Sequence, residues 1–318
     1  MISRKFIIWA CGLLFVFGSC AEDMVKPIEN DKDAPGTVQD VKTESLPGAV
    51  KFTYTLPSDP DLLYVLAKYT NKTGKVMEFR SSFYTNSVTV EGFGDTDTYK
   101  VELYTVDRSE NRSQPQIVEV APLTPPILSC YESLSMVSDF GGMTFEMDNK
   151  FKSDLAIYVC TPDELGDMVL AETFYSAREE IVYSVRGYDA VPRRFGIFLQ
   201  DKYGNETDTL FTELTPIYER ELDKTKFREM YLQNDSRVDS YDGKMEYVWN
   251  GRISKDGDSG GVGLHTGTGT KDGPAVFTFD LGVLAKLSRF ALWAIQDDKH
   301  FYNDMSPRRY EVWGCATE

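Results

Sequence analysis

The chain has 318 residues, and its 50 Asp and Glu outnumber its 34 Lys and Arg, which gives a formal net charge of −16. A protein this acidic repels phosphate backbones, so nucleic acid is a poor candidate partner. The chain has two histidines, which leave little material for a histidine-based catalytic or metal centre. With 42% hydrophobic residues, it has enough apolar side chains for the cores of two or three domains.

The first 19 residues have the features of a secretory signal peptide. A short basic head precedes an apolar run, residues 6–17, which is shorter than the roughly 20 residues of a membrane-spanning helix. The run ends in Gly-Ser before Cys20, which resembles a bacterial lipobox with Phe17 where leucine is usual. The resemblance implies that residues 1–19 are removed and that Cys20 is lipidated. The alternative is a plain secreted protein in which this cysteine is incidental.

The residues after Cys20 suggest where the lipid anchor leads. Two carboxylates follow the cysteine at once, which is similar to the surface-export signal of Bacteroidota lipoproteins. This likeness implies an outer-membrane protein that faces the extracellular side. Residues 20–34 are polar and charged, and we interpret them as a tether from the membrane.

Two parts of the chain repeat one pattern of short strands, at an offset of about 94 residues. Apolar and polar residues alternate in residues 48–56, with the two-residue period of a half-buried strand, and again in residues 141–149. An Asp-x-x-x-Asn turn at residues 107–111 returns at residues 201–205, and both side chains favour tight turns because they bond nearby backbone. This offset predicts two tandem β-sandwiches.

The two copies resemble fibronectin type III modules. The first copy matches the family's strand-opening tyrosine, its Asp-x-x-x-Asn turn and the final serine and proline at Tyr99, Asp107, Asn111, Ser113 and Pro115. In the second copy Phe195 takes the place of the tyrosine. The resemblance implies one domain over residues 35–123 and another over residues 124–217, with a stiff proline-rich joint at residues 121–126.

The composition changes after the second copy. Residues 218–235 are predicted to be a helical or mixed linker, and strands are expected at residues 275–282, 287–295 and 306–314. The motifs that follow the linker resemble the discoidin-like family, the coagulation factor V/VIII C-type galactose-binding-like sandwiches. The matching residues are Asp242, Gly243, Trp249, Phe277, Phe279, Asp280, Leu281, Gly282, Leu287, Phe290, Pro307, Tyr310, Glu311, Val312, Trp313 and Gly314.

The resemblance implies a third sandwich over residues 236–318. Family members continue for several strands beyond the last match, so we expect this domain to be incomplete. The predicted fold class is therefore all-β: tandem fibronectin type III-like β-sandwiches followed by a partial discoidin-like β-sandwich. This order of domains behind a lipobox is similar to that of Bacteroidota surface lipoproteins.

The discoidin-like resemblance also points to ligand-binding loops at one end of the third sandwich. The candidate sugar-binding residues are His265, Asp298, His300, Tyr302, Asn303 and Arg308. The alternative is that these are solvated loop tips. The family often keeps a structural calcium ion near its Asp-Gly turn, so Asp242 is a candidate calcium ligand, or else a plain turn residue. Trp249, Trp293 and Trp313 are expected in the core.

Two further features concern covalent chemistry. Thr209 lies in an Asp-Thr-Leu triplet that resembles the O-glycosylation motif of the same phylum. Cys130 and Cys160 either pair in an oxidising compartment or are small buried residues without a bond, and the second alternative is favoured.

We expect no catalytic activity. The glycine-rich loop at residues 255–274 lacks the Gly-Lys-Ser/Thr ending of a phosphate-binding loop, and no cofactor is implied beyond the calcium ion. The features together predict a surface lipoprotein that binds a glycan for a glycan-utilisation system, with an outer-membrane transporter or glycosidases as partners. The alternatives are a structural or adhesive protein that binds another protein and, less favoured, an enzyme or an enzyme's accessory part.

Overall fold

In the computed structural model we describe residues 31–238, 243–253, 263–266, 274–293, 307 and 309–316. Strands dominate these residues, which hold a single α-helix, and none of their helices is long and apolar enough to cross a membrane. The all-β prediction and the tandem of sandwiches are confirmed.

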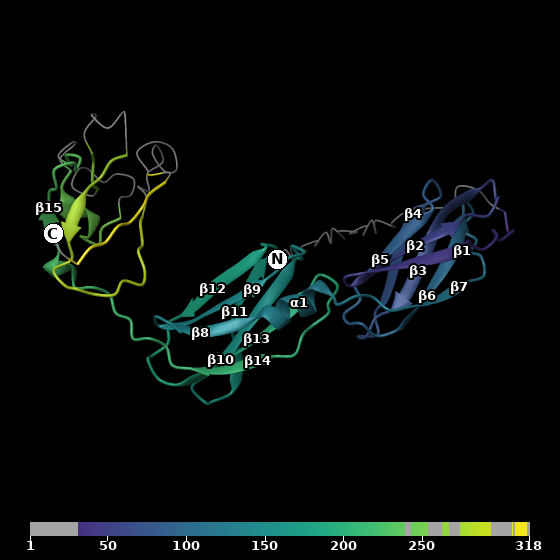
Figure 1. The fold of residues 1–318 in the computed structure, drawn as a ribbon, viewed down its shortest axis with the longest axis horizontal. Helices are drawn as coiled ribbons and strands as arrows, with labels where there is room; N and C mark the ends of the chain where they lie inside the picture. Colours follow the sequence, from purple (N-terminus) through teal and green to yellow (C-terminus); the bar gives the residue numbers. More distant parts are fainter. Residues whose placement is uncertain are drawn as a thin grey trace, which may run out of the picture. The chain divides into compact units, whose positions relative to one another are not determined.

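The first sandwich consists of two antiparallel sheets, drawn in purple and blue in Figure 1. The three-stranded sheet has the order β1-β2-β5, with bounds β1 Gln39–Leu46, β2 Ala49–Thr55 and β5 Ser87–Glu91. The four-stranded sheet has the order β4-β3-β6-β7, with bounds β4 Val76–Ser82, β3 Leu62–Thr70, β6 Tyr99–Asp107 and β7 Gln116–Val120. This division into three and four strands is that of a fibronectin type III module.

The core of the first sandwich follows from the alternation in β2. Val50, Phe52 and Tyr54 are buried while Thr53 and Thr55 face solvent. Phe93 stacks on Tyr69 with ring centroids 4.4 Å apart. Burying each such large apolar side chain stabilises the fold by about 1.5–3 kcal/mol.

The second sandwich repeats this order of strands and appears in teal in Figure 1. Its three-stranded sheet has the order β12-β9-β8, with bounds β12 Glu180–Arg186, β9 Gly142–Asp148 and β8 Ser135–Asp139. Its four-stranded sheet has the order β11-β10-β13-β14, with bounds β11 Met168–Ser176, β10 Leu155–Pro162, β13 Arg193–Asp201 and β14 Leu210–Leu214. Phe145 of β9 packs on Phe174 of β11, with ring centroids 5.5 Å apart.

One irregularity interrupts the four-stranded sheet of this second sandwich. The antiparallel pairing of β10 with β11 shifts its register between Val159 and Cys160. Such a bulge bends the bulged strand and increases the local twist of the sheet.

The chain leaves both sandwiches by the same backbone contact. After the first, the Leu123 N–H donates to the Leu46 carbonyl and its own carbonyl accepts from Gly48, both at 3.0 Å. After the second, Ile217 repeats this with Asp139 at 2.9 Å and Gly141 at 2.8 Å. The predicted repeat therefore extends to the exit of each domain.

Helix α1, Pro126–Ser133, was not expected from the sequence. It begins in the proline-rich joint, because Pro126 at the first helical position needs no hydrogen-bond partner for a backbone N–H. Its Ile127 and Cys130 are buried. Cys130 and Cys160 are free thiols here; Cys130 is buried, as the alternative without a bond expects, whereas Cys160 is only half-buried.

The C-terminal part holds short elements only. These are the 3-10 helix η1 Lys224–Lys226, strand β15 Arg228–Met230, the 3-10 helix η3 Met245–Val248 and strand β16 Thr278–Asp280. The prediction of strands beyond β16 is wrong for residues 287–293 and 309–314, since the described residues there pair with no other strand. The helical alternative for residues 218–235 is also wrong, because η1 and β15 occupy the middle of that segment.

The chain divides into two compact units, and the second sandwich has residues in both. The first sandwich belongs to one unit together with residues 145–183 and 194–212. Residues 137–144 and 184–193 belong to the other, with the chain from residue 213 onward.

Candidate functional site

An aromatic cluster forms where β15 pairs with β16. The antiparallel register places Glu229 opposite Phe279, which brings the preceding Phe227 beside the Phe279 ring, with centroids 5.8 Å apart. Trp249, directly after η3, packs against both rings at centroid distances of 5.7 Å to Phe227 and 5.1 Å to Phe279. Trp249 and Phe227 are half-buried, so part of each ring faces solvent.

A groove of about 440 Å³ lies over this cluster. Its lining combines two aromatic rings with two lysines, two glutamates and a threonine: Lys224, Thr225, Phe227, Glu229, Lys244, Glu246 and Trp249. Lys244 and Glu246 form an exposed ion pair at 3.6 Å, so the charges on the lining balance one another. Aromatic rings beside hydrogen-bonding groups can hold a small ligand, and here five charged or polar side chains accompany the two rings.

Two local devices hold the groove in shape. The Asp223 carboxylate caps η1 by accepting from the Thr225 N–H at 3.1 Å and from its hydroxyl at 2.6 Å. After β16, the chain turns back at Gly282 with φ of +66°. A Cβ atom there would lie 2.3 Å from the Lys226 carbonyl oxygen, so only glycine fits against η1.

Of the groove's seven lining residues, the sequence singled out Trp249 alone. Trp249 and Phe279 belong to the predicted discoidin-like motif, and Gly282 is the glycine of that motif. Lys224, Phe227 and Glu229 were missed because their segment reads as a charged linker. β15 is three residues long, and its sequence Arg228-Glu229-Met230 carries no alternation that could have revealed it.

Of the predicted ligand-binding residues, His265 lies among the described residues, and its side chain is half-buried. The other predicted ligand-binding residues, Asp298, His300, Tyr302, Asn303 and Arg308, lie outside the described residues, as do the candidate calcium ligand Asp242 and the lipidation site Cys20. Thr209 is half-buried, and a Cβ on Gly196 would lie 3.0 Å from its methyl carbon. The core prediction is wrong for Trp293 and Trp313, which are 61% and 86% exposed.

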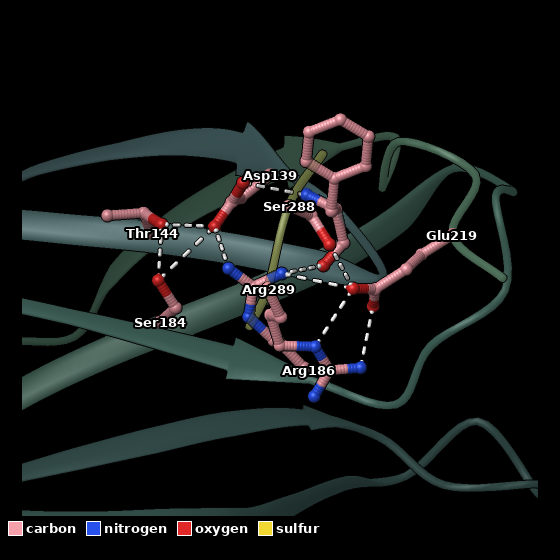
Figure 2. A network of polar contacts seen from close by, with 8 residues as sticks. Asp139, Thr144, Ser184, Arg186, Glu219, Ser288 and Arg289 are labelled. Atoms are coloured by element: carbon pink, nitrogen blue, oxygen red, sulfur yellow. Dashed lines mark hydrogen bonds and ion pairs between the residues drawn. The ribbon is translucent and has the colours of Figure 1, made fainter. Parts of the chain in front are cut away.

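A polar network connects the second sandwich to the C-terminal part (Figure 2). At its inner end, the Asp139 carboxylate accepts from Thr144 at 2.8 Å, Ser184 at 3.2 Å and Arg186 at 2.8 Å. Burial would raise the pKa of Asp139, but the hydrogen bonds from Thr144 and the Phe140 N–H, with the charge of Arg186, hold this pKa below its ordinary value.

Glu219 forms the outer end of the network (Figure 2). Its two carboxylate oxygens accept from Nε and Nη2 of Arg289, each at 2.9 Å, and Ser288 donates to the same carboxylate. Arg186 lies 3.7 Å from it and joins the two ends. The Ser288 hydrogen bond, assisted by Arg289 and Arg186, holds the pKa of Glu219 below its ordinary value. The charged groups of the network are hydrogen-bonded to one another. We therefore assign the network a structural role, which is to hold residues 288 and 289 against the second sandwich.

One group of carboxylates among the described residues has metal-binding spacing. The ligand atoms of Asp31, Asp61 and Asp107 lie within 4.8 Å of one another. The buried Asp107 carboxylate already accepts from the backbone N–H groups of Ser109 and Asn111 and from the Asn111 amide. The Asp107 carboxylate therefore has a structural role in its turn, and the Asp31 carboxylate accepts from the Asn111 amide of the same turn.

Three family models match successive parts of the chain. Residues 35–122 match DUF4959, residues 123–225 match DUF5126 and residues 249–318 match DUF5000, each described as a domain of unknown function. No curated protein matches the chain. The network therefore connects Glu219, in the DUF5126 match, to Ser288 and Arg289, in the DUF5000 match.

Several solved structures match parts of the chain. The SusE-like protein BT2857 is 28% identical over 51% of this chain and 57% of its own length, with a TM-score of 0.33. The two-domain fibronectin type III segment of chicken tenascin is 12% identical over 56% of this chain and 99% of its own, with a TM-score of 0.27. The fn3 domain of human collagen alpha-1(XX) is 14% identical over 30% and 93%, with a TM-score of 0.26.

Proposed function

We propose that this protein is a lipid-anchored surface protein that binds carbohydrate without catalysis, as a component of a glycan-utilisation system. The observation that carries the proposal is the groove floored by Phe227 and Trp249. Aromatic rings offer an apolar face to the C–H side of a sugar ring, while side chains beside them bond its hydroxyls. The two sandwiches serve as the spacer between the anchor and this groove.

The charge around the groove favours a neutral glycan. Two lysines and two glutamates line it, so it offers hydrogen bonds of both kinds without a net local charge. The chain as a whole carries a net charge of −16, which repels polyanionic polysaccharides at a distance. We therefore expect uncharged polysaccharides to bind in preference to uronate-rich or sulfated ones.

The sequence-based candidates belong to the same proposal. His265 and the residues outside the described part, Asp298, His300, Tyr302, Asn303 and Arg308, supply further contacts in a discoidin-like domain, and Asp242 binds a structural calcium ion. Cys20 carries the lipid, and Thr209 carries an O-linked glycan. A transporter or glycosidases of the outer membrane receive the captured glycan.

Calorimetric titration of the full chain against soluble neutral polysaccharides tests the binding proposal. Trp249→Ala should weaken binding at least about tenfold, which corresponds to roughly 1.4 kcal/mol. Trp313→Ala is the matched control, because this tryptophan is 86% exposed and is not among the groove's lining residues. Equal loss in both variants, or no binding of any polysaccharide by the wild type, contradicts the proposal.

Fractionation of the native host tests the anchor. Cys20→Ala should move the protein from the membrane to the soluble fraction, because a lipid chain contributes about 0.8 kcal/mol of membrane affinity per buried methylene. Continued membrane attachment of this variant contradicts lipidation at Cys20.

A second candidate function is supported by a separate observation. Several large apolar side chains of the C-terminal part are at least half exposed, namely Leu284, Leu287, Phe290, Trp293, Tyr310, Val312 and Trp313. Exposed apolar side chains of this size can serve as contacts for another protein. A surface protein that binds another protein would be unaffected by Trp249→Ala but would lose its partner when Trp293 and Trp313 are replaced by alanine.

A further inference from the structure

The Asp-x-x-x-Asn turn of the two sandwiches has one geometry. In the first copy, Asp107 accepts from the Asn111 N–H at 2.9 Å and from its side-chain amide at 3.0 Å. In the second copy, Asp201 accepts from the Asn205 N–H at 3.0 Å and from its amide at 2.8 Å. Each asparagine amide is therefore fixed in place by the aspartate of its own turn.

In both copies the fixed amide also binds a part of the chain that precedes its sandwich. The Asn111 amide donates to the Asp31 carboxylate at 3.0 Å and to the Asp33 carbonyl at 3.3 Å. The Asn205 amide donates to the carbonyl of Gly92, in the first sandwich, at 3.1 Å. Asn205 is 6% exposed, so this second contact is shielded from water.

The residue two places after the aspartate adds a contact in each copy. In the first turn, the Ser109 hydroxyl accepts from the Asp31 N–H at 3.0 Å. In the second turn, the Tyr203 hydroxyl donates to the carboxylate of Glu91 at the end of β5. Ser109 therefore contacts the backbone of the segment before the first sandwich, whereas the longer Tyr203 contacts the Glu91 side chain of the first sandwich.

Two glycines of the first sandwich allow the second turn to approach. Gly92 has φ of +84°, and a Cβ atom on it would lie 2.9 Å from the Tyr203 ring. A Cβ atom on Gly94 would lie 2.7 Å from the side-chain oxygen of Asn205. The contact therefore depends on residues of both sandwiches: the two glycines of the first, and Tyr203 and Asn205 of the second.

We propose that this turn is a docking element used twice, and that its second copy locks the second sandwich to the first. Residues 121–126 form the covalent joint between the two sandwiches. The Leu123 hydrogen bonds to Leu46 and Gly48 attach this joint to the first sandwich. The Tyr203 and Asn205 contacts with Glu91 and Gly92 supply a second attachment besides the covalent joint, and this attachment restricts rotation of the second sandwich about the joint. This inference goes beyond the proposed function and does not depend on sugar binding.

Distances between spin labels measured by pulsed electron paramagnetic resonance test the lock. The labels are attached at Tyr84→Cys and Leu165→Cys, two exposed positions in different sandwiches, with every native cysteine except the buried Cys130 replaced by serine. The wild-type joint should give one narrow distance distribution. The double variant Tyr203→Ala with Asn205→Ala should broaden it at least twofold.

Matched variants separate the lock from damage to the turn. Ser109→Ala with Asn111→Ala makes the corresponding double change in the first turn and should leave the distribution narrow. Gly94→Leu leaves both turns intact and should broaden it, which keeps the test valid if the double variant misfolds. A broad distribution in the wild type, or a narrow one in both the double variant and Gly94→Leu, overturns the proposal.

Discussion

Arg289 and Glu219 form a two-pronged ion pair between residues 70 positions apart, with both N–O distances at 2.9 Å. The Glu219 side chain is 15% exposed, so its carboxylate depends on its partners for the hydrogen bonds that water would otherwise supply. The pair is therefore worth more than the ion pairs that lie fully in solvent.

Replacing Glu219 should destabilise the protein measurably. We expect Glu219→Ala to lower the free energy of unfolding by about 1–3 kcal/mol, because it removes the acceptor that Ser288 and Arg289 share and the ion-pair partner that links them to Arg186. The control is Glu119→Ala, which breaks the exposed pair with Lys100 and should cost no more than about 1 kcal/mol. Urea unfolding measures both, and equal effects would show that the network adds nothing to a surface pair.

The network should make stability depend on acid pH. The pKa values of Asp139 and Glu219 lie below their ordinary values of 3.8 and 4.5 in the folded state. Such groups contribute stability that is present above these values and is lost as the pH falls through the lower folded-state pKa. Between pH 6 and pH 3, the wild type should therefore lose more unfolding free energy than the double variant Asp139→Asn with Glu219→Gln. Parallel losses would contradict this coupling.

Gly141 should tolerate no side chain. It has φ of +63°, and a Cβ atom would lie 2.7 Å from a carboxylate oxygen of Glu219. Gly166→Ala is the matched control, since Gly166 has φ of +90° with nothing within 4 Å. Both variants suffer backbone strain of about 1–2 kcal/mol, and Gly141→Ala should lose further stability through the clash. Thermal unfolding that ranks Gly166→Ala as the less stable variant would contradict the close contact.

The first sandwich should fold alone, and better with the residues that dock on its turn. We expect a fragment of residues 31–123 to unfold cooperatively and to be about 1 kcal/mol more stable than one of residues 35–123. The difference should shrink in Asn111→Ala, which removes the amide contacts to Asp31 and Asp33 but leaves the Ser109 hydrogen bond to the Asp31 N–H. Two fragments of equal stability would mean that residues 31–34 act as the free tether that the sequence suggested.

The sequence predicted the sandwiches because their signals are local. The alternation around Phe52 fixes which face of β2 is buried, and the Asp-x-x-x-Asn spacing fixes a turn whose hydrogen bonds lie within five residues. The contact of Asn205 with Gly92 could not be predicted, because 113 positions separate the two residues and neither segment has a sequence pattern that indicates its partner.

The C-terminal groove was only partly predictable for a related physical reason. Phe279 and Trp249 stand in a recognisable order along the chain, but a strand of three residues such as β15 carries too little alternation to be distinguished from a linker. Its existence depends on the partner strand β16, some 50 positions later. Exposed tryptophans such as Trp313 were misjudged because tryptophan in a strand-like motif normally packs inward.

The bulge in β11, where Ala171 is the extra residue between Leu170 and Glu172, changes how the second sandwich presents its edge to other chains. β11 is an edge strand with exposed Val169 and Leu170, the composition that invites pairing with another copy. The register shift divides the β10–β11 ladder into a run from Leu155 to Val159 and a shorter one from Cys160 to Pro162. A strand twisted at that point offers an incoming chain no long flat row of free backbone groups, so the irregularity works against edge-to-edge association of the sandwich.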